Sequence, residues 1–130
     1  MRNFISISMF AAIVGITSTA ALAQQPTAEQ LQMAYNAARN QLGVLEYCQD
    51  KGYGDADAVA IETKMIGLLP PPADTSKGDD AEAQGKQGKV SALGVQQDIA
   101  TAAKAQNSTE EKLCQTMVGA IKQAGAALPK

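Results

Sequence analysis

The sequence has no histidine among its 130 residues. This excludes Ser-His-Asp and Cys-His nucleophiles, histidine metal sites and the side chain that most often transfers protons near neutral pH. Tryptophan is also absent, and the aromatic residues are two Phe and three Tyr. The core must therefore consist of aliphatic side chains, Met and Ala. At roughly 25 cal/mol per Å² of buried apolar area, such a core is marginal for a small domain.

The first residues have the composition of an export signal. Arg2 is followed by an uncharged, mostly apolar run over residues 4–16, and Ala21-Leu22-Ala23 provides the small residues that signal peptidase requires. The run of about 13 residues is shorter than the roughly 20 that a membrane span needs. We therefore predict a cleaved signal peptide over residues 1–23, cut between Ala23 and Gln24, and a soluble periplasmic or secreted product.

Residues 24–130 are predicted to form a single domain. Without Arg2 this part has ten basic and thirteen acidic residues, a net charge of −3. It contains no basic cluster, which argues against nucleic acid and anionic lipid as partners. We expect the partner to be another envelope or extracellular protein. Membrane contact is not indicated and stays open, as does the oligomeric state.

The two cysteines, Cys48 and Cys114, both lie in the exported part. An even number of cysteines in an oxidising compartment predicts a disulfide. Closing a loop of about 66 residues would stabilise the fold by roughly 4 kcal/mol, comparable with the net stability of a small domain. The alternatives are two free thiols or a redox-active pair, which favours closer spacing such as Cys-x-x-Cys.

A first helix is predicted from Thr27, which forms a capping-box pattern with Gln30, to Lys51 and Gly52, which favour a helix end. Its apolar positions recur at helical spacing. They are Leu31, Tyr35, Ala38, Leu42 and Leu45, with Met33, Val44 and Cys48 widening the stripe.

A second helix is predicted to begin at a cap formed by Asp55 or Asp57 and to end at Pro70-Pro71-Pro72. Its apolar residues are Ala58, Ile61, Met65, Leu68 and Leu69. The three prolines favour an extended, stiff connector over residues 70–78.

The stretch over residues 79–106 is the hardest to interpret. Its glycines Gly85, Gly88 and Gly94 each cost a helix about 1 kcal/mol relative to alanine. Apolar residues nevertheless favour helix from about residue 80 to 105, ending at Asn107, with a break at Gly94, two helices or partial disorder as alternatives. These apolar residues are Val90, Leu93, Ile99, Ala102 and Ala103.

A last helix is predicted to begin at a second capping box over residues 108–111 and to end at Gly125. A disulfide requires α-carbons about 5 to 6 Å apart. The first and last helices should therefore run antiparallel side by side, where Gly43 and Gly119 permit close approach or merely weaken their helices. The predicted fold is all-α, a small bundle of about four helices with one disulfide joining the first and last.

The remaining candidates for chemistry have simpler explanations. The pairs Asp55 with Asp57 and Asp79 with Asp80 lie at helix starts, where acidic residues serve as caps. The acidic loop that begins at Asp50 fails the EF-hand pattern, because its twelfth position is Ile61 instead of Glu. Residues 85–89 lack the spacing of a phosphate loop and are expected to form an exposed, flexible turn. We therefore predict no catalytic residue, no metal ligand and no cofactor.

The segment Asn40-Gln-Leu-Gly-Val-Leu-Glu-Tyr-Cys-Gln, taken with Leu113-Cys114-Gln115 and the middle rich in proline and glycine, resembles a group of small exported proteins of Gram-negative bacteria. These proteins are sometimes grouped with the pore-forming early-secreted-antigen helical hairpins, whose Trp-x-Gly turn this chain lacks. The two-cysteine layout is also similar to the periplasmic acid-stress chaperones. Because the sequence contains no catalytic arrangement, we predict a non-enzymatic helical protein that binds other proteins, in envelope stress or as a chaperone. The alternative is a membrane-active or pore-forming helical protein.

Overall fold

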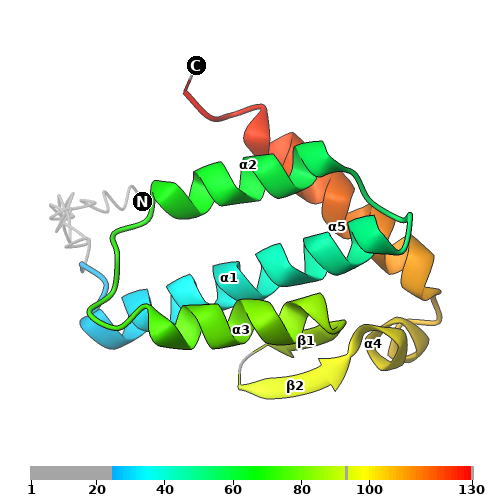
Figure 1. Ribbon diagram of the computed structural model, residues 1–130, viewed down its shortest axis with the longest axis horizontal. Coiled ribbons are helices and arrows are strands. Elements are labelled where there is room, and N and C mark those ends of the chain that lie inside the picture. The colour runs from blue at the N-terminus through cyan, green and yellow to red at the C-terminus, as the bar shows by residue number, and fades with distance from the viewer. Residues whose placement is uncertain (1–24, 93, 130) are drawn as a thin grey trace, which may run out of the picture.

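The computed structural model describes residues 25–92 and 94–129. The predicted cleavage site between Ala23 and Gln24 lies outside them. Within this range the chain folds into five helices and one antiparallel hairpin (Figure 1). The elements are α1 (Ala28–Asp50), α2 (Ala56–Gly67), α3 (Ser76–Lys86), β1 (Lys89–Ala92), β2 (Val95–Asp98), α4 (Ile99–Ala105) and α5 (Glu110–Gly125).

The first two helices begin as the sequence predicts. Thr27 Oγ1 accepts a hydrogen bond from the Gln30 backbone N–H at 3.2 Å, and Gln30 Oε1 accepts one from the Thr27 N–H at 2.9 Å, so the capping box is formed. Asp55 caps α2 by accepting from the Ala58 N–H at 3.1 Å. At the end of α1, Gly52 has φ +80°, the left-handed conformation that favours glycine after a helix.

The middle of the chain differs from the prediction. The connector is shorter than expected, because α3 begins at Ser76, before Gly78. A single helix to residue 105 is wrong, since the hairpin of β1 and β2 separates α3 from α4. Gly88 (φ +77°) ends the α3 region and Gly94 (φ +79°) lies in the hairpin turn, so both glycines mark places where an α-helix cannot continue. The alternative of a helix broken at Gly94 is also wrong, because α3 already ends at Lys86 and Gly94 separates two strands.

The last helix begins at Glu110, within the predicted capping box over residues 108–111. Asn107, at φ +51°, ends the α4 region as expected. The N-cap of α5 is Thr109, the second residue of that box, whose hydroxyl accepts from the Lys112 N–H at 3.2 Å. The predicted end at Gly125 is confirmed.

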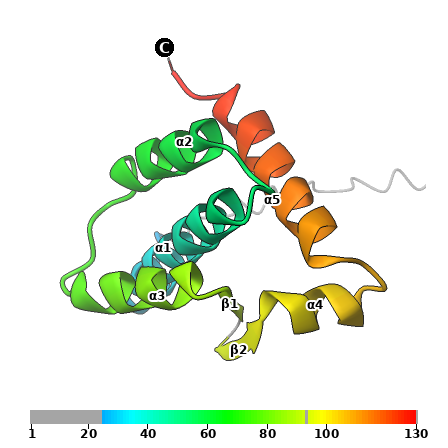
Figure 2. The same ribbon diagram turned by 45° about the vertical axis from the view of Figure 1, so that its right-hand side comes forward.

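The helices α1, α2 and α3 lie nearly along one direction, and α5 crosses the end of α1 steeply (Figures 1 and 2). Following the chain, α2 runs antiparallel to α1, whereas α3 runs parallel to it. The disulfide between Cys48 and Cys114 is formed, with the α-carbons 5.6 Å apart. It joins the C-terminal end of α1 to α5 at this crossing, so the expected side-by-side packing of the first and last helices is wrong. A disulfide fixes one point of contact, not an angle.

The closest helix contact is between α1 and α3, and glycines permit it. A Cβ at Gly43 would collide with the carbonyl group of Glu82, and one at Gly85 would collide with the Asn40 carbonyl oxygen. Gly43 therefore allows close approach, as expected, but to α3 instead of α5. Gly119 on α5 has open space where its Cβ would lie, so it permits no such approach.

The core consists of two small clusters on either side of the C-terminal half of α1. One surrounds the fully buried disulfide and the other lies between α1, α2 and α5. The buried members are Val44, Cys48, Ile99 and Cys114 in the first, and Leu45, Ala58, Val118 and Ile121 in the second. The N-terminal half of α1 lies outside both clusters.

Candidate functional site

The acidic residues that the sequence singled out occupy structural positions. Asp55 caps α2 and also pairs with Lys122 of α5, and the hydrogen bond from Lys122 is the main cause that lowers the pKa of Asp55. Asp79 pairs with Arg39 at 2.7 Å. Asp57 and Asp80 are exposed. Of these four carboxylates only Asp55 caps a helix as expected, whereas Asp57 and Asp79 lie within the first turns of α2 and α3.

Of residues 85–89, Gln87 and Gly88 form a turn, and Lys86 and Gln87 are exposed as expected, but the glycines are not. Gly85 and Gly88 are buried, because Gly85 lies against the backbone of α1 and Gly88 against the ring of Tyr47. Tyr47 in turn donates a hydrogen bond to Glu110 at 2.6 Å, which is the largest of the effects that raise its pKa to about 12. The glycines here serve tertiary packing. Over residues 25–92 and 94–129, no group of three or more Cys, Asp or Glu side chains is placed to hold a metal ion.

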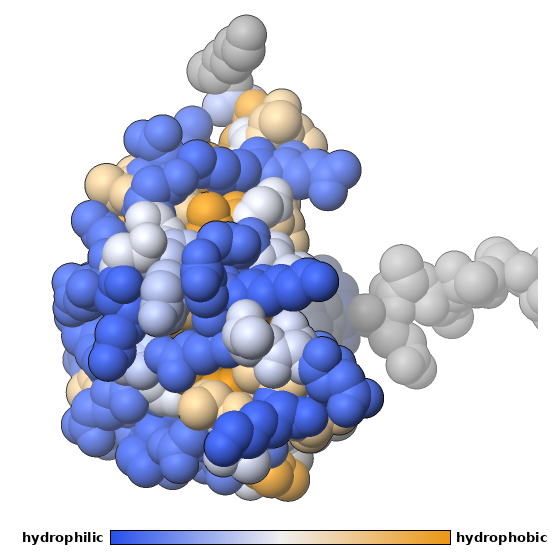
Figure 3. Space-filling view, turned by 90° about the vertical axis from the view of Figure 1, so that its right-hand side faces the viewer, coloured by the Kyte–Doolittle hydropathy of each residue, from blue (hydrophilic) through white to orange (hydrophobic). Residues whose placement is uncertain are grey.

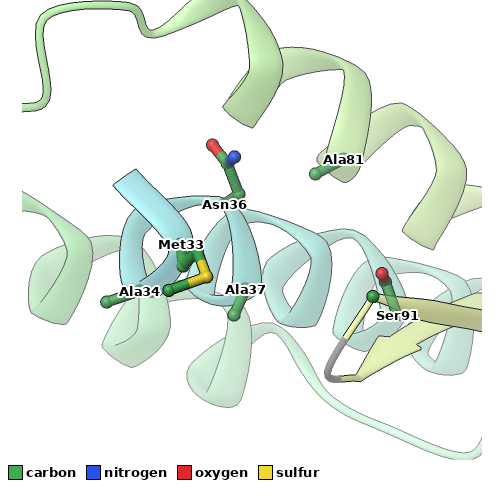
Figure 4. Close-up of a pocket in the computed structure, with 7 residues that line it drawn as sticks. Met33, Ala34, Asn36, Ala37, Ala81 and Ser91 are labelled. Carbon is green, nitrogen blue, oxygen red and sulfur yellow. The ribbon is translucent and has the colours of Figure 1, made fainter. Parts of the chain in front are cut away.

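A groove runs along the face of α1 that is turned to the hairpin. Its first part is a cavity of about 470 Å³ between α1, α3 and the hairpin. In Figure 4, Met33, Ala34 and Ala37 come from α1, Ala81 from α3 and Ser91 from β1. Asn36 and Gly94 complete the lining.

The second part is a cavity of about 320 Å³ that continues toward α5. It shares Ala37 and Ser91 with the first, so the two cavities adjoin each other along α1. Its other lining residues are Asn40, Gln41, Val44, Val90 and Met117. We call the two cavities together the α1 groove.

The lining of the α1 groove contains no charged side chain among the residues that the structure describes. It consists of Met, Ala, Val and Gly with three side-chain amides and one hydroxyl. At one end Met33 is 57 % exposed, although the sequence suggested that it widens the core stripe. Because α1 extends beyond the two core clusters, the apolar side chains near its N-terminus line the groove and do not pack in those clusters.

A third cavity, of about 330 Å³, lies between α2 and α3 and differs from the α1 groove in having charged side chains in its lining. Three of its six lining residues are charged, namely Arg39, Glu46 and Glu82. Arg39 Nε donates to Glu82 at 2.7 Å, and Lys86 lies 3.0 Å from the same carboxylate. Burial tends to raise the pKa of Glu82, but the hydrogen bonds from Lys86 and Arg39 outweigh it and lower that pKa overall. These charges pair with one another across the α1–α3 seam.

Glu62 on α2 is a buried carboxyl group, with only 2 % of the residue exposed. Its Oε2 has no hydrogen-bond partner in the part of the chain that the structure describes. Burial raises the pKa of Glu62 above its ordinary value of 4.5. The group lies on the inner face of α2 near Ala58, and nothing in the sequence distinguished it from a surface glutamate.

The face over α4 and α5 is mostly hydrophilic, and apolar side chains appear there only in small separate patches (Figure 3). None of the helices in the described residues combines the length and the apolar character required to cross a bilayer. Comparisons with protein-family models, with curated proteins and with solved structures each gave no match.

The sequence did not identify the α1 groove. The signal present was the run of small residues Ala34, Ala37 and Ala38 on α1, which is compatible with a core helix as well as with a lined groove. The walls come from α3 and β1, about 40 to 50 residues farther along the chain, and the hairpin itself was not predicted.

Proposed function

We propose that this chain is an exported, non-enzymatic protein whose α1 groove binds an apolar, uncharged segment of a partner polypeptide, in a chaperone-like role. The observation that carries the proposal is the lining of the groove, which combines apolar surface with a few polar groups and no charge. Each of its two cavities falls within the roughly 300 to 1,000 Å³ typical of ligand sites.

The chemistry of the lining selects the class of ligand. Moving a charged group into an apolar site without a counter-charge is costly, so phosphates, carboxylates and cations are poor ligands here. Met33 and Met117 have flexible thioether side chains that adapt to differently shaped apolar groups, as in binding surfaces that accept several partners. Asn36, Gln41 and Ser91 provide amide and hydroxyl groups, which pair well with a peptide backbone.

The exported setting is part of the proposal. It is supported by the signal-like residues 1–23 and by the disulfide between Cys48 and Cys114, which is typical of proteins in oxidising compartments. An envelope protein there encounters partner chains that expose apolar segments before they fold.

The test is a substitution that fills the groove. Ala37 belongs to both cavities and is exposed, so Ala37→Trp adds bulk inside the groove without disturbing the core. The matched control is Ala83→Trp, at an exposed position of α3 that lines none of the three cavities. Binding of a fluorescein-labelled peptide of Ala, Leu and Ser residues is measured by fluorescence anisotropy.

We expect wild type and Ala83→Trp to bind the peptide with equal affinity and Ala37→Trp to bind at least about tenfold more weakly, because the ring occupies the volume that the peptide needs. The proposal is wrong if wild type does not bind the peptide or if Ala37→Trp binds it as well as wild type does.

A further inference from the structure

The hairpin has two outer edges, and the hydrogen-bond register shows which backbone groups face outward. In an antiparallel pair, alternate residues bond to the opposite strand and the others direct their N–H and C=O groups away from it. The Gly88 carbonyl accepts from the Ile99 N–H at 2.8 Å, which fixes this alternation. With Val90 opposite Gln97, the inward pairs are Gly88 with Ile99, Val90 with Gln97 and Ala92 with Val95. The outward residues are therefore Lys89 and Ser91 on β1, and Gln96 and Asp98 on β2.

The outer edge of β1 is already occupied by a side chain. Asn40 Nδ2 donates to the Lys89 carbonyl at 3.0 Å, and the Ser91 N–H donates to Asn40 Oδ1 at 2.9 Å. The amide of Asn40 thus takes the place of a neighbouring strand. Its two bonds fall on the two residues that the register turns outward on this side.

The outer edge of β2 is open. The N–H and C=O of Gln96 and the N–H of Asp98 have no hydrogen-bond partner among residues 25–92 and 94–129. All four residues of β2 are exposed. The Asp98 carbonyl belongs to the first turn of α4, because Asp98 is the N-cap of that helix. Three backbone groups in a row therefore remain available to an added strand.

We infer that β2 binds an extended segment of a partner polypeptide as a third strand of this sheet. The side chains of β2 specify the partner's character. Val95 is 65 % exposed and shares one face with Gln97, whereas Gln96 and Asp98 share the other. The Asp98 side chain is also 65 % exposed. Its ion pair with Lys89 is long, at 3.7 Å.

The partner strand therefore carries an apolar residue beside Val95 and a basic residue beside Asp98, since apolar and opposite-charge cross-strand pairs stabilise a sheet. A second copy of this chain fits less well, because its own strand, Val-Gln-Gln-Asp, contains no basic residue. The inference rests on the proposed function only in that the ligand is a polypeptide. The edge does not include the groove residue Ala37.

The test uses a fluorescein-labelled nine-residue peptide that alternates Val with Lys or Thr, with fluorescence anisotropy as the readout. Proline is tolerated on an edge strand where its missing N–H faces outward, so Gln96→Pro removes one donor while the pairing of β1 with β2 is retained. We expect it to bind at least about tenfold more weakly than wild type. Gln96→Thr keeps the N–H and should bind as wild type does.

A measurement on the unaltered protein covers the case in which Gln96→Pro does not fold. Saturating peptide should slow amide hydrogen exchange at Gln96 and Asp98. Equal binding by a folded Gln96→Pro, no binding of the peptide by wild type, or unchanged exchange at both amides overturns the inference. Slowed exchange without peptide as the protein concentration rises also overturns it, because the occupant is then a second copy. Ala37→Trp should bind this peptide normally, which separates the edge from the groove.

Discussion

The side-chain amide of Asn40 on α1 accepts a hydrogen bond from the backbone N–H of Ser91 on β1, at 2.9 Å. Through its Nδ2, Asn40 also donates to the carbonyls of Ala81 and Lys89, each at 3.0 Å. Only 2 % of Asn40 is exposed. One buried amide therefore connects α1, α3 and β1, and it holds the hairpin that forms a wall of the α1 groove.

Replacing Asn40 with an apolar residue should destabilise the fold strongly. Asn40→Leu leaves the Lys89 carbonyl and the Ser91 N–H without their partner and removes a second bond to the Ala81 carbonyl, and we expect the free energy of unfolding to fall by about 3 kcal/mol. Urea unfolding followed by circular dichroism measures this change. Gln49→Leu, at an exposed position of the same helix, should change the stability by no more than about 0.5 kcal/mol. Equal stability of the two variants would contradict the role assigned to Asn40.

Substitution of Gly43 on α1 and of Gly119 on α5 by alanine should change the stability of the protein in opposite directions. Gly43→Ala places a Cβ against the carbonyl group of Glu82, and backbone cannot move aside as a flexible side chain does. We expect a loss of about 2 to 3 kcal/mol. Gly119→Ala meets open space on an exposed helix and should stabilise the protein by about 0.5 to 1 kcal/mol. Thermal unfolding of both variants tests the pair, and a shift of the same sign in both would contradict the tight α1–α3 contact.

The burial of the disulfide between Cys48 and Cys114 predicts that the folded protein resists reduction. Because Cys48 and Cys114 are fully buried, a reductant should reach the bond only after unfolding. The double variant Cys48→Ala with Cys114→Ala should be less stable by roughly 4 kcal/mol, which is the loop-closure value for 66 residues. Urea unfolding of the oxidised protein and of the double variant measures the difference. Mass spectrometry of protein expressed with export to an oxidising compartment should find no free thiol, and two free thiols there would refute the structural role of the bond.

The sequence predicts the parts of this fold that depend on neighbouring residues. Thr27 with Gln30, Asp55 before α2, and Asn107 all act within a few residues, so the helix boundaries that they determine were found. The pairing of Cys48 with Cys114 followed from their number and predicted compartment. These features need no knowledge of the tertiary structure.

The missed features depend on contacts between distant segments. Gly85 and Gly88 were interpreted as helix-weakening or flexible residues, because the α1 backbone and the Tyr47 ring that require them lie about 40 residues away in the chain. In the sequence, Asn40 is one polar residue of an amphipathic helix, and only the structure shows that β1 lies beside it. The α1 groove combines residues of α1, α3, the hairpin and α5, so no local pattern could have revealed it.

Glu62 provides a prediction about pH. Burial raises the folded-state pKa of this carboxyl group above its ordinary 4.5, so the protonated form is favoured in the fold. A group with a raised folded-state pKa contributes stability that is fully present below its unfolded pKa and is lost as the pH rises through the folded pKa. Ionised Glu62 therefore destabilises the protein above about pH 4.5.

Glu62→Gln keeps the shape of the side chain and removes this ionisation. We expect the variant to gain stability over wild type as the pH is raised from about 4.5 toward neutrality, with no gain below that range. Asp55 and Glu82, whose pKa values are lowered, act in the opposite direction in both proteins and cancel in the difference. Urea unfolding at a series of pH values gives that difference, and Glu111→Gln, on the exposed face of α5, is the matched control. If the gain of Glu62→Gln is independent of pH, or is the same as that of Glu111→Gln, the carboxyl group of Glu62 is not desolvated in the folded protein.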